Sequence, residues 1–335
     1  MRRRALLSTL GVGLLGGCVA DGPGGSDGGS TTDRTTAPTT DEPTADDSTT
    51  TTTPRTPDVG VPASETAGPP WGDDVMRVVA WPDVTDGTPI AMRPATQEAS
   101  LPTAMVDITL ANETDVRFDT NFHHWGLWKR VDGEWFYLAP QYWPEPAMSL
   151  DTGESHTWTL SVDNTQLDGN VIQNGGSKDD ISLVGLGGGT YAFTTHGNFA
   201  TEDYEHAHGF AARVDLAGEP VELVPTSDVT ATIRDGDAIV VEVDRGDDGG
   251  SEEVAYTVRR LADDAVVDAE PRRIVTEQAL RSRVLRDTLS FFEEGVERVH
   301  LRGLETHLNP FGFDAEEPQV LAYAGRRYRI TSETA

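Results

Sequence analysis

The sequence predicts a mainly β chain with an α+β ending: an antiparallel β-sandwich over residues 71–225, then a small domain over residues 226–335. Three observations predict this. Apolar and polar residues alternate with period two in several short segments of the first region. Turn-forming residues separate these segments, and no helical pattern interrupts them. The second region combines strand patterns with one amphipathic helical segment, which is typical of an antiparallel sheet covered by a helix.

The strands of the first region are predicted from this alternation. It is clear in residues 106–110, 156–162, 191–195 and 210–216. Alternation of this kind places one face of a strand in the core and the other in water. Asp132-Gly133, between two segments rich in aromatic residues, predicts a tight β-hairpin.

The second region predicts two hairpins and one helix. Its predicted strands cover residues 229–234, 238–244, 254–261, 296–301 and 320–330. The helix is predicted over residues 275–294, with Thr276 as N-cap and Gly295 as C-terminal stop. Its apolar stripe consists of Leu280, Val284, Leu285, Thr288 and Phe292. Arg281, Arg283 and Asp287 lie outside this stripe.

Three motifs in the first region resemble a known kind of domain. They are Asn112-Glu113-Thr114 after a strand, the turn at residues 150–155, and Leu186-Gly187-Gly188-Gly189-Thr190-Tyr191. Together they resemble exported immunoglobulin-like domains, including the BsuPI-type proteinase-inhibitor sandwich, although Thr152 stands where that pattern usually has proline. The resemblance implies an immunoglobulin-like sandwich in which the Tyr191 hydroxyl bonds to nearby backbone, as in a tyrosine corner. It implies little about function.

The N-terminus has the pattern of an export signal. Three arginines precede a short apolar run, and residues 15–18 read Leu-Gly-Gly-Cys. The run is too short to span a bilayer and is typical of a signal peptide, here residues 1–17. Arg3 and Arg4 resemble the twin-arginine export signal. The residues before Cys18 resemble the lipobox of prokaryotic lipoproteins, which implies cleavage before Cys18 and lipidation of its sulfur.

Residues 18–70 predict a disordered, lipid-anchored tether rich in Thr, Asp, Gly and Pro, because no apolar periodicity could support a core.

The whole chain carries a formal charge of −30. Lys129 and Lys178 are its only lysines, a composition that resembles the proteins of salt-loving archaea. A basic surface that could neutralise phosphates is lacking, so nucleic-acid binding is not expected. Cys18 is the only cysteine, which excludes an internal disulfide.

Histidines provide one candidate site. His206 and His208 are two residues apart, so both leave the same face of a strand, and His196 ends the preceding strand. If the three converge, their imidazoles could hold zinc or copper. The alternative is that they are ordinary surface or half-buried polar residues.

Two further candidates lie in loops. Tyr142 and Trp143 belong to a Pro-flanked segment, where exposed rings could contact a ligand. The other aromatic residues nearby could form a sugar- or ligand-binding platform, but for Trp158 and one face of the hairpin we favour the sandwich core. Asn112 begins the sequon Asn112-Glu113-Thr114 and is a candidate for N-glycosylation.

Motifs for nucleophilic, zinc-protease or nucleotide-binding catalysis are missing from the sequence, so we expect no enzyme. The sequence favours a lipoprotein held in the cell membrane of a halophilic archaeon, facing outward, that binds a ligand or another envelope protein. Metal binding or delivery through the histidines is the alternative. Protease inhibition is a third possibility, which rests on the resemblance alone.

Overall fold

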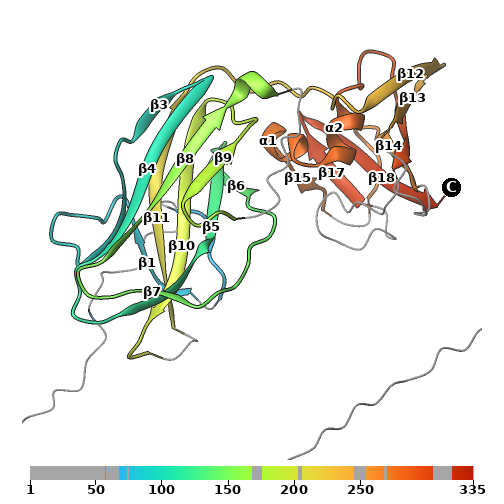
Figure 1. The fold of residues 1–335 in the computed structure, drawn as a ribbon. Helices are drawn as coiled ribbons and strands as arrows, with labels where there is room; N and C mark the ends of the chain where they lie inside the picture. The colour runs from blue at the N-terminus through green and yellow to red at the C-terminus, as the bar shows by residue number, and fades with distance from the viewer. Residues whose placement is uncertain are drawn as a thin grey trace, which may run out of the picture. The chain divides into compact units, whose positions relative to one another are not determined.

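The computed structural model describes residues 57, 68–73, 75–167, 176–202, 206–244, 254–267, 270–304 and 319–334. These residues are mainly β-strand, as the sequence predicts, and the strands among them form three sheets (Figure 1). The segment Thr52–Ala335 is one compact unit. The predicted signal peptide and most of the predicted tether lie outside the described residues.

Two of the sheets build what we call the two-sheet part, residues 75–217. The larger sheet follows the order β1 (Val75–Ala80), β11 (Ala207–Ala217), β10 (Gly189–Phe199), β5 (Phe118–Val131) and β6 (Glu134–Ala139). Its short strands β3 (Glu98–Ser100) and β7 (Met148–Leu150) pair with β11 and β5. The smaller sheet follows the order β2 (Ile90–Pro94), β4 (Thr103–Asn112), β8 (Ser155–Asp163) and β9 (Asp180–Leu183). A short 3₁₀ helix, Asn164–Gln166, follows β8.

The two sheets share one hydrophobic core. Ile108 and Trp158 come from the smaller sheet, Phe193 and Phe210 from the larger, and all four are fully buried. Figure 1 shows the sheets as two layers, with β4 and β8 in one and β10 and β11 in the other. The alternation read from the sequence is therefore the alternation between this core and the outer faces.

The predicted Asp132-Gly133 hairpin is present between β5 and β6. Both turn residues have positive φ, 51° and 90°, as the favoured two-residue hairpin turn requires. The Tyr191 hydroxyl donates to the carbonyl of Gly187 over 2.6 Å, which is the backbone hydrogen bond that the resemblance implied.

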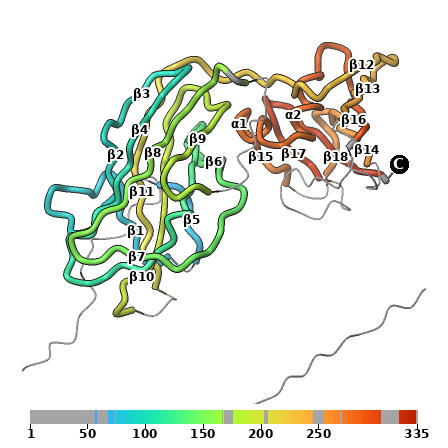
Figure 2. The backbone as a smooth tube through the Cα atoms, viewed as in Figure 1, coloured from blue at the N-terminus to red at the C-terminus, as the bar shows by residue number. Residues whose placement is uncertain are grey.

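The prediction of purely antiparallel sheets is wrong. In the two-sheet part β1 and β3 run parallel to β11, and β9 runs parallel to β8. The strands β1 and β11 lie side by side although they are far apart in the sequence (Figure 2). Alternation reports which face of a strand is buried, but it carries no information on the direction of the neighbouring strand.

The C-terminal part, residues 226–334, contains the third sheet. Its strands follow the order β12 (Val229–Asp235), β13 (Ala238–Val243), β16 (Arg298–Leu304), β14 (Val254–Arg260), β18 (Arg326–Thr334), β17 (Gln319–Tyr323) and β15 (Arg272–Arg273). This sheet is also mixed, because β13 pairs parallel with β16 and β15 with β17. Val241, Tyr256, Leu285 and Leu301 belong to its own hydrophobic core.

The single predicted helix is two short helices, α1 (Thr276–Leu280) and α2 (Arg283–Leu289). Val275, not Thr276, is the N-cap of α1. The break falls at Arg281 and Ser282, where the Ser282 hydroxyl accepts a hydrogen bond from the Leu285 N–H over 3.3 Å and caps α2.

Most charged residues of the two helices and the break between them are buried, which the apolar stripe does not indicate. Glu277, Arg281, Arg286 and Asp287 are buried, and Arg283 is half-buried. Arg281 is 4% exposed and donates to the carbonyls of Val184 and Gly185, which belong to the two-sheet part. Burial lowers its pKa to about 10. Glu277 forms a buried ion pair with Lys129 of β5 and accepts from the Gly187 N–H over 3.1 Å. The face of the helices that points away from their own core is therefore a second, polar packing surface.

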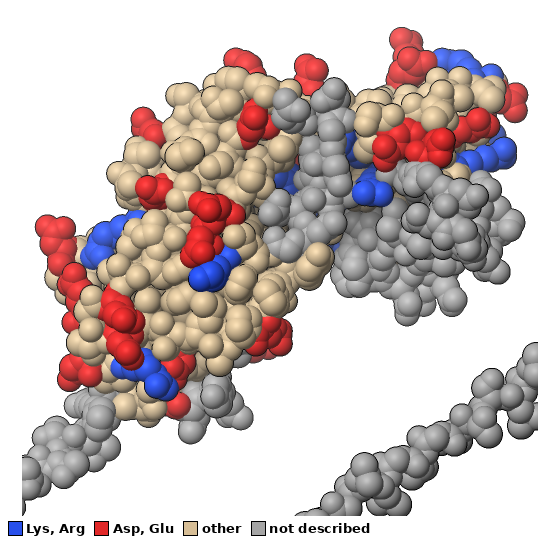
Figure 3. All heavy atoms as spheres, in the orientation of Figure 1, with Lys and Arg blue, Asp and Glu red and all other residues tan. Residues whose placement is uncertain are grey.

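Carboxylates are spread over the surface. Figure 3 shows acidic side chains over both the two-sheet part and the C-terminal part of the face in view, with fewer basic ones among them. On this face the acidic side chains are spread over both parts and do not gather in one patch.

Candidate functional site

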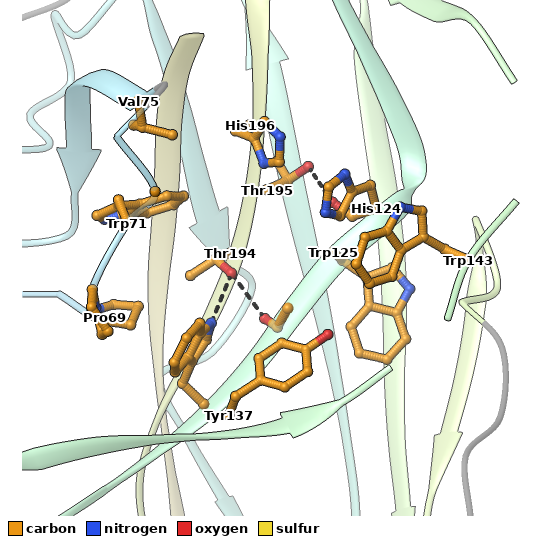
Figure 4. Close-up of a pocket in the computed structure, with 14 residues that line it drawn as sticks. Pro69, Trp71, Val75, His124, Trp125, Tyr137, Trp143, Thr194, Thr195 and His196 are labelled. Atoms are coloured by element: carbon orange, nitrogen blue, oxygen red, sulfur yellow. Dashed lines mark hydrogen bonds between the residues drawn. The ribbon is translucent and has the colours of Figure 1, made fainter. Parts of the chain in front are cut away.

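An aromatic pocket lies on the outer face of the larger sheet, and its volume is about 190 Å³. Its lining combines residues of strands β5, β6 and β10 with the segment before β1, the first residue of β1, and Trp143 from the segment between β6 and β7. The lining residues are Pro69, Pro70, Trp71, Gly72, Val75, His124, Trp125, Gly126, Trp128, Tyr137, Trp143, Thr194, Thr195 and His196. In Figure 4, Pro69 and Trp71 stand on one side of it, and Tyr137, His124 and Trp143 on the other.

Two glycines make room for the pocket. A Cβ atom at Gly209 of β11 would lie 2.8–2.9 Å from three ring atoms of Trp71, so only glycine lets this indole lie against the strand. A Cβ atom at Gly126 of β5 would lie 2.6 Å from the Thr194 hydroxyl and 3.0 Å from the Trp128 nitrogen. A side chain at either position would displace a ring that lines the pocket.

Polar groups of the lining are held by hydrogen bonds to the protein. The Trp128 N–H donates to the Thr194 hydroxyl over 3.3 Å, and that hydroxyl donates to the Gly126 carbonyl over 3.2 Å. The Tyr137 hydroxyl donates to the Pro140 carbonyl over 2.6 Å, and burial raises its pKa above the usual range. These bonds fix the orientation of the rings, so the pocket is formed before any ligand arrives.

Two histidines and a tryptophan form the far edge of the pocket. The Trp143 ring stacks on His124 with a centroid distance of 4.0 Å and an interplanar angle of 18°. His124 in turn meets His196 edge to face at 4.4 Å. His124 lies in a bulge of β5, since the pairing with β10 shifts register between Thr195 and Gly197.

A second cavity of about 480 Å³ adjoins the pocket at these two histidines. Its lining is mostly polar. Besides His124 and His196 it includes Arg117, Asp119, Thr120, Asn121, Ala147, Met148, Ser149, Gly197 and Asn198. Arg117 is paired with Asp119 at 2.8 Å. An aromatic pocket and a polar cavity thus meet across one histidine pair.

The predicted convergence of His196, His206 and His208 is not found. His196 pairs with Gly209 of β11, and directly paired residues share a face of the sheet, here the outer one. His208 is the neighbour of Gly209 in β11, so its side chain points to the opposite face. His208 is buried and bonds to Glu202 over 2.6 Å, and burial lowers its pKa. Within the described residues, no group of three or more His, Cys, Asp or Glu could hold a metal ion.

Tyr142 and Trp143, the predicted ligand contacts, have different positions. Trp143 lines the aromatic pocket. Tyr142 is 61% exposed and is not part of that lining. Sequence reasoning missed Trp71, which comes from the segment before β1. It also left Trp128 undecided, although Trp128 is out of phase with the buried Trp125 and Leu127 and therefore faces outward.

Asn112 is a structural residue, so its prediction as a glycosylation site is wrong for the folded chain. Its side chain has 0% exposure. The amide donates to the carbonyls of Val116 and Leu150 over 2.9 and 3.0 Å. Its oxygen accepts from the Thr114 N–H and hydroxyl over 3.1 and 2.6 Å. The Asn-x-Thr pattern thus connects the turn after β4 to the end of β7.

Replacing Asn112 by alanine is expected to lower the free energy of unfolding by about 2–4 kcal/mol, because buried backbone groups lose their partners. Chemical denaturation at constant salt measures this. The matched control is Asn121→Ala, whose hydrogen bond to Pro144 is exposed and whose cost is expected to be about 1 kcal/mol or less. Equal costs for the two variants would contradict the structural role of Asn112.

Arg3, Arg4 and Cys18 lie outside the described residues. None of the helices in the described part of the chain has the length and apolar character needed to cross a membrane.

No protein-family model matches the chain, and a search of curated proteins finds no match.

Proposed function

We propose that this chain is an exported lipoprotein, anchored through Cys18 to the outer side of the cell membrane of a halophilic archaeon, that binds a ligand without catalysing a reaction. The N-terminal sequence supports this localisation. Arg3 and Arg4 resemble the twin-arginine export signal, and the residues before Cys18 resemble a lipidation signal. The predicted tether, apart from Pro69 and Pro70, which line the aromatic pocket, would hold the binding part away from the membrane surface.

The proposal includes a finer description of the fold. The two-sheet part is an immunoglobulin-like sandwich, and the C-terminal part is an α+β module that packs on it. The shared core of two sheets and the Tyr191–Gly187 hydrogen bond support the first description. The helices α1 and α2, which contribute Ala279 and Leu285 to the core of the third sheet, support the second.

The observation that carries the binding function is the aromatic pocket. It is concave and largely apolar, and several of its polar groups are fixed by hydrogen bonds to the protein, which are usual features of a small-molecule site. Its hydroxyls are unsuited to nucleophilic attack, since Thr194 and Thr195 donate to the carbonyls of Gly126 and His124 instead of to a base. Binding therefore fits this arrangement better than catalysis.

The test is a binding screen with the full chain purified in detergent. Tryptophan fluorescence is recorded during titration with neutral tetrasaccharides, adenosine, indole and a decaproline peptide. We expect saturable binding of at least one probe, weakened about tenfold or more in Trp143→Ala because truncated aromatic anchors cost the most affinity. Trp135→Ala is the matched control, since Trp135 packs on Trp81 and lines neither cavity. Binding that Trp143→Ala leaves intact, or no binding at all, would overturn the proposed function.

A further inference from the structure

We propose that the ligand of the aromatic pocket is a neutral carbohydrate chain of two or more pyranose units, which continues from the pocket into the adjoining polar cavity. The inference rests on the proposed function, because it names the ligand class of the same site. Three features of the groove lead to it: ring faces, uncharged hydrogen-bonding groups, and length.

Ring faces provide the first step. The Trp71 indole lies against Gly209, and the Trp143 ring is held against His124 at 4.0 Å. Both are partly exposed and both line the pocket. A pyranose has an apolar face of C–H groups that packs on an indole, while its hydroxyls stay at the edge for hydrogen bonds. Two tryptophans on opposite sides of a small pocket suit a ring that offers two such faces.

Charge provides the second step. Among the described residues that line the aromatic pocket there is no carboxylate, arginine or lysine, although the chain contains 56 Asp and Glu residues. In the polar cavity the charge of Arg117 is matched by Asp119 at 2.8 Å. The other polar groups there are amides, hydroxyls and imidazoles, among them Asn121, Asn198 and Ser149. Such groups hydrogen-bond sugar hydroxyls, and they offer no surplus positive charge to an anionic ligand.

Length provides the third step. The aromatic pocket, at about 190 Å³, is smaller than the roughly 300–1,000 Å³ of sites that enclose a drug-sized ligand, and it suits a single small ring. The polar cavity, at about 480 Å³, adds space for further units. Because both cavities are lined by His124 and His196, a ligand that fills both must pass this histidine pair.

The experiment compares ligands of increasing length. The full chain in detergent is titrated with glucose, maltose, maltotetraose, cellobiose, cellotetraose, N-acetylglucosamine and chitotetraose. These sugars form three series: maltose with maltotetraose, cellobiose with cellotetraose, and N-acetylglucosamine with chitotetraose, glucose being the monomer of the first two. In at least one series we expect the tetramer to bind about tenfold or more tightly than the monomer, as a second subsite requires. Trp143→Ala is expected to weaken every member of that series. Asn198→Ala, in the polar cavity, is expected to weaken the tetramer and leave the monomer within about twofold. Trp135→Ala should change neither.

The outcomes separate this inference from the proposed function. Binding of adenosine, indole or decaproline with no binding of any saccharide would overturn the carbohydrate inference and leave the pocket as a binding site. Equal affinities for monomer and tetramer in every series would overturn the extended groove. Failure of every probe would remove both.

Discussion

Replacing Glu277 by alanine is expected to lower the free energy of unfolding by about 3–5 kcal/mol, because it leaves the Lys129 ammonium group buried without its partner. Only 9% of the Lys129 side chain and 4% of the Glu277 side chain is exposed. The Gly187 N–H would lose its acceptor as well. The measurement is chemical denaturation at constant salt, followed by tryptophan fluorescence and by circular dichroism.

A double-variant cycle separates the ion pair from simple packing. Lys129→Met combined with Glu277→Leu removes both charges and is expected to cost much less than Glu277→Ala alone, since no charge is then left unpaired. The control is Glu293→Ala, which breaks the exposed pair of Arg234 and Glu293 and is expected to cost about 1 kcal/mol or less. A Glu277→Ala cost no larger than that of Glu293→Ala would contradict the importance of the buried pair.

This pair illustrates why the helices were only partly predictable. The apolar residues of the pattern correctly indicated Val284 and Leu285 as core, because their spacing reports burial. The same pattern left Arg281 and Asp287 outside the apolar stripe and gave no sign that they are buried. Both are buried, since Arg281 donates to carbonyls of the two-sheet part and Asp287 accepts from the N–H and hydroxyl of Thr226. A one-dimensional pattern cannot reveal that a second surface covers the polar side of a helix.

Strands were predictable where local chemistry decides them. The Asp132-Gly133 turn needs positive φ at both residues, and this requirement is written in the sequence itself. Pairing direction and register depend on distant segments. The metal prediction failed for this reason: with His196 opposite Gly209, His208 falls on the other face of the sheet.

The candidate site was predictable only in part. Trp143 was a candidate because its Pro-flanked loop indicates exposure. Trp71 gave no such signal, since its role depends on Gly209, a residue far away in the sequence whose missing side chain makes room for the indole. Asn112 was misread because a sequon and a buried turn asparagine have the same sequence. In each case the deciding partner is a non-local residue or backbone group.

The proposed attachment to the membrane depends on a single sulfur atom, that of Cys18. The apolar run before Cys18 is short and is predicted to be removed, and the tether is polar. Retention then depends on lipid attached at Cys18, where each buried methylene group contributes about 0.8 kcal/mol and two chains hold stably. A thiol without lipid provides none of this free energy.

Cys18→Ala is therefore expected to shift the protein almost completely from the membrane to the medium, as measured by immunoblotting of separated fractions. Ser26→Ala, in the same tether, is the matched control and should leave retention unchanged. The pair Arg3→Lys and Arg4→Lys is expected to keep the protein inside the cell, which distinguishes failed export from failed anchoring. Mass spectrometry of the native N-terminus is expected to find residues 1–17 removed and Cys18 lipidated. Unchanged membrane retention of Cys18→Ala, or an unmodified Cys18 thiol, would show that the chain is held at the membrane in another way.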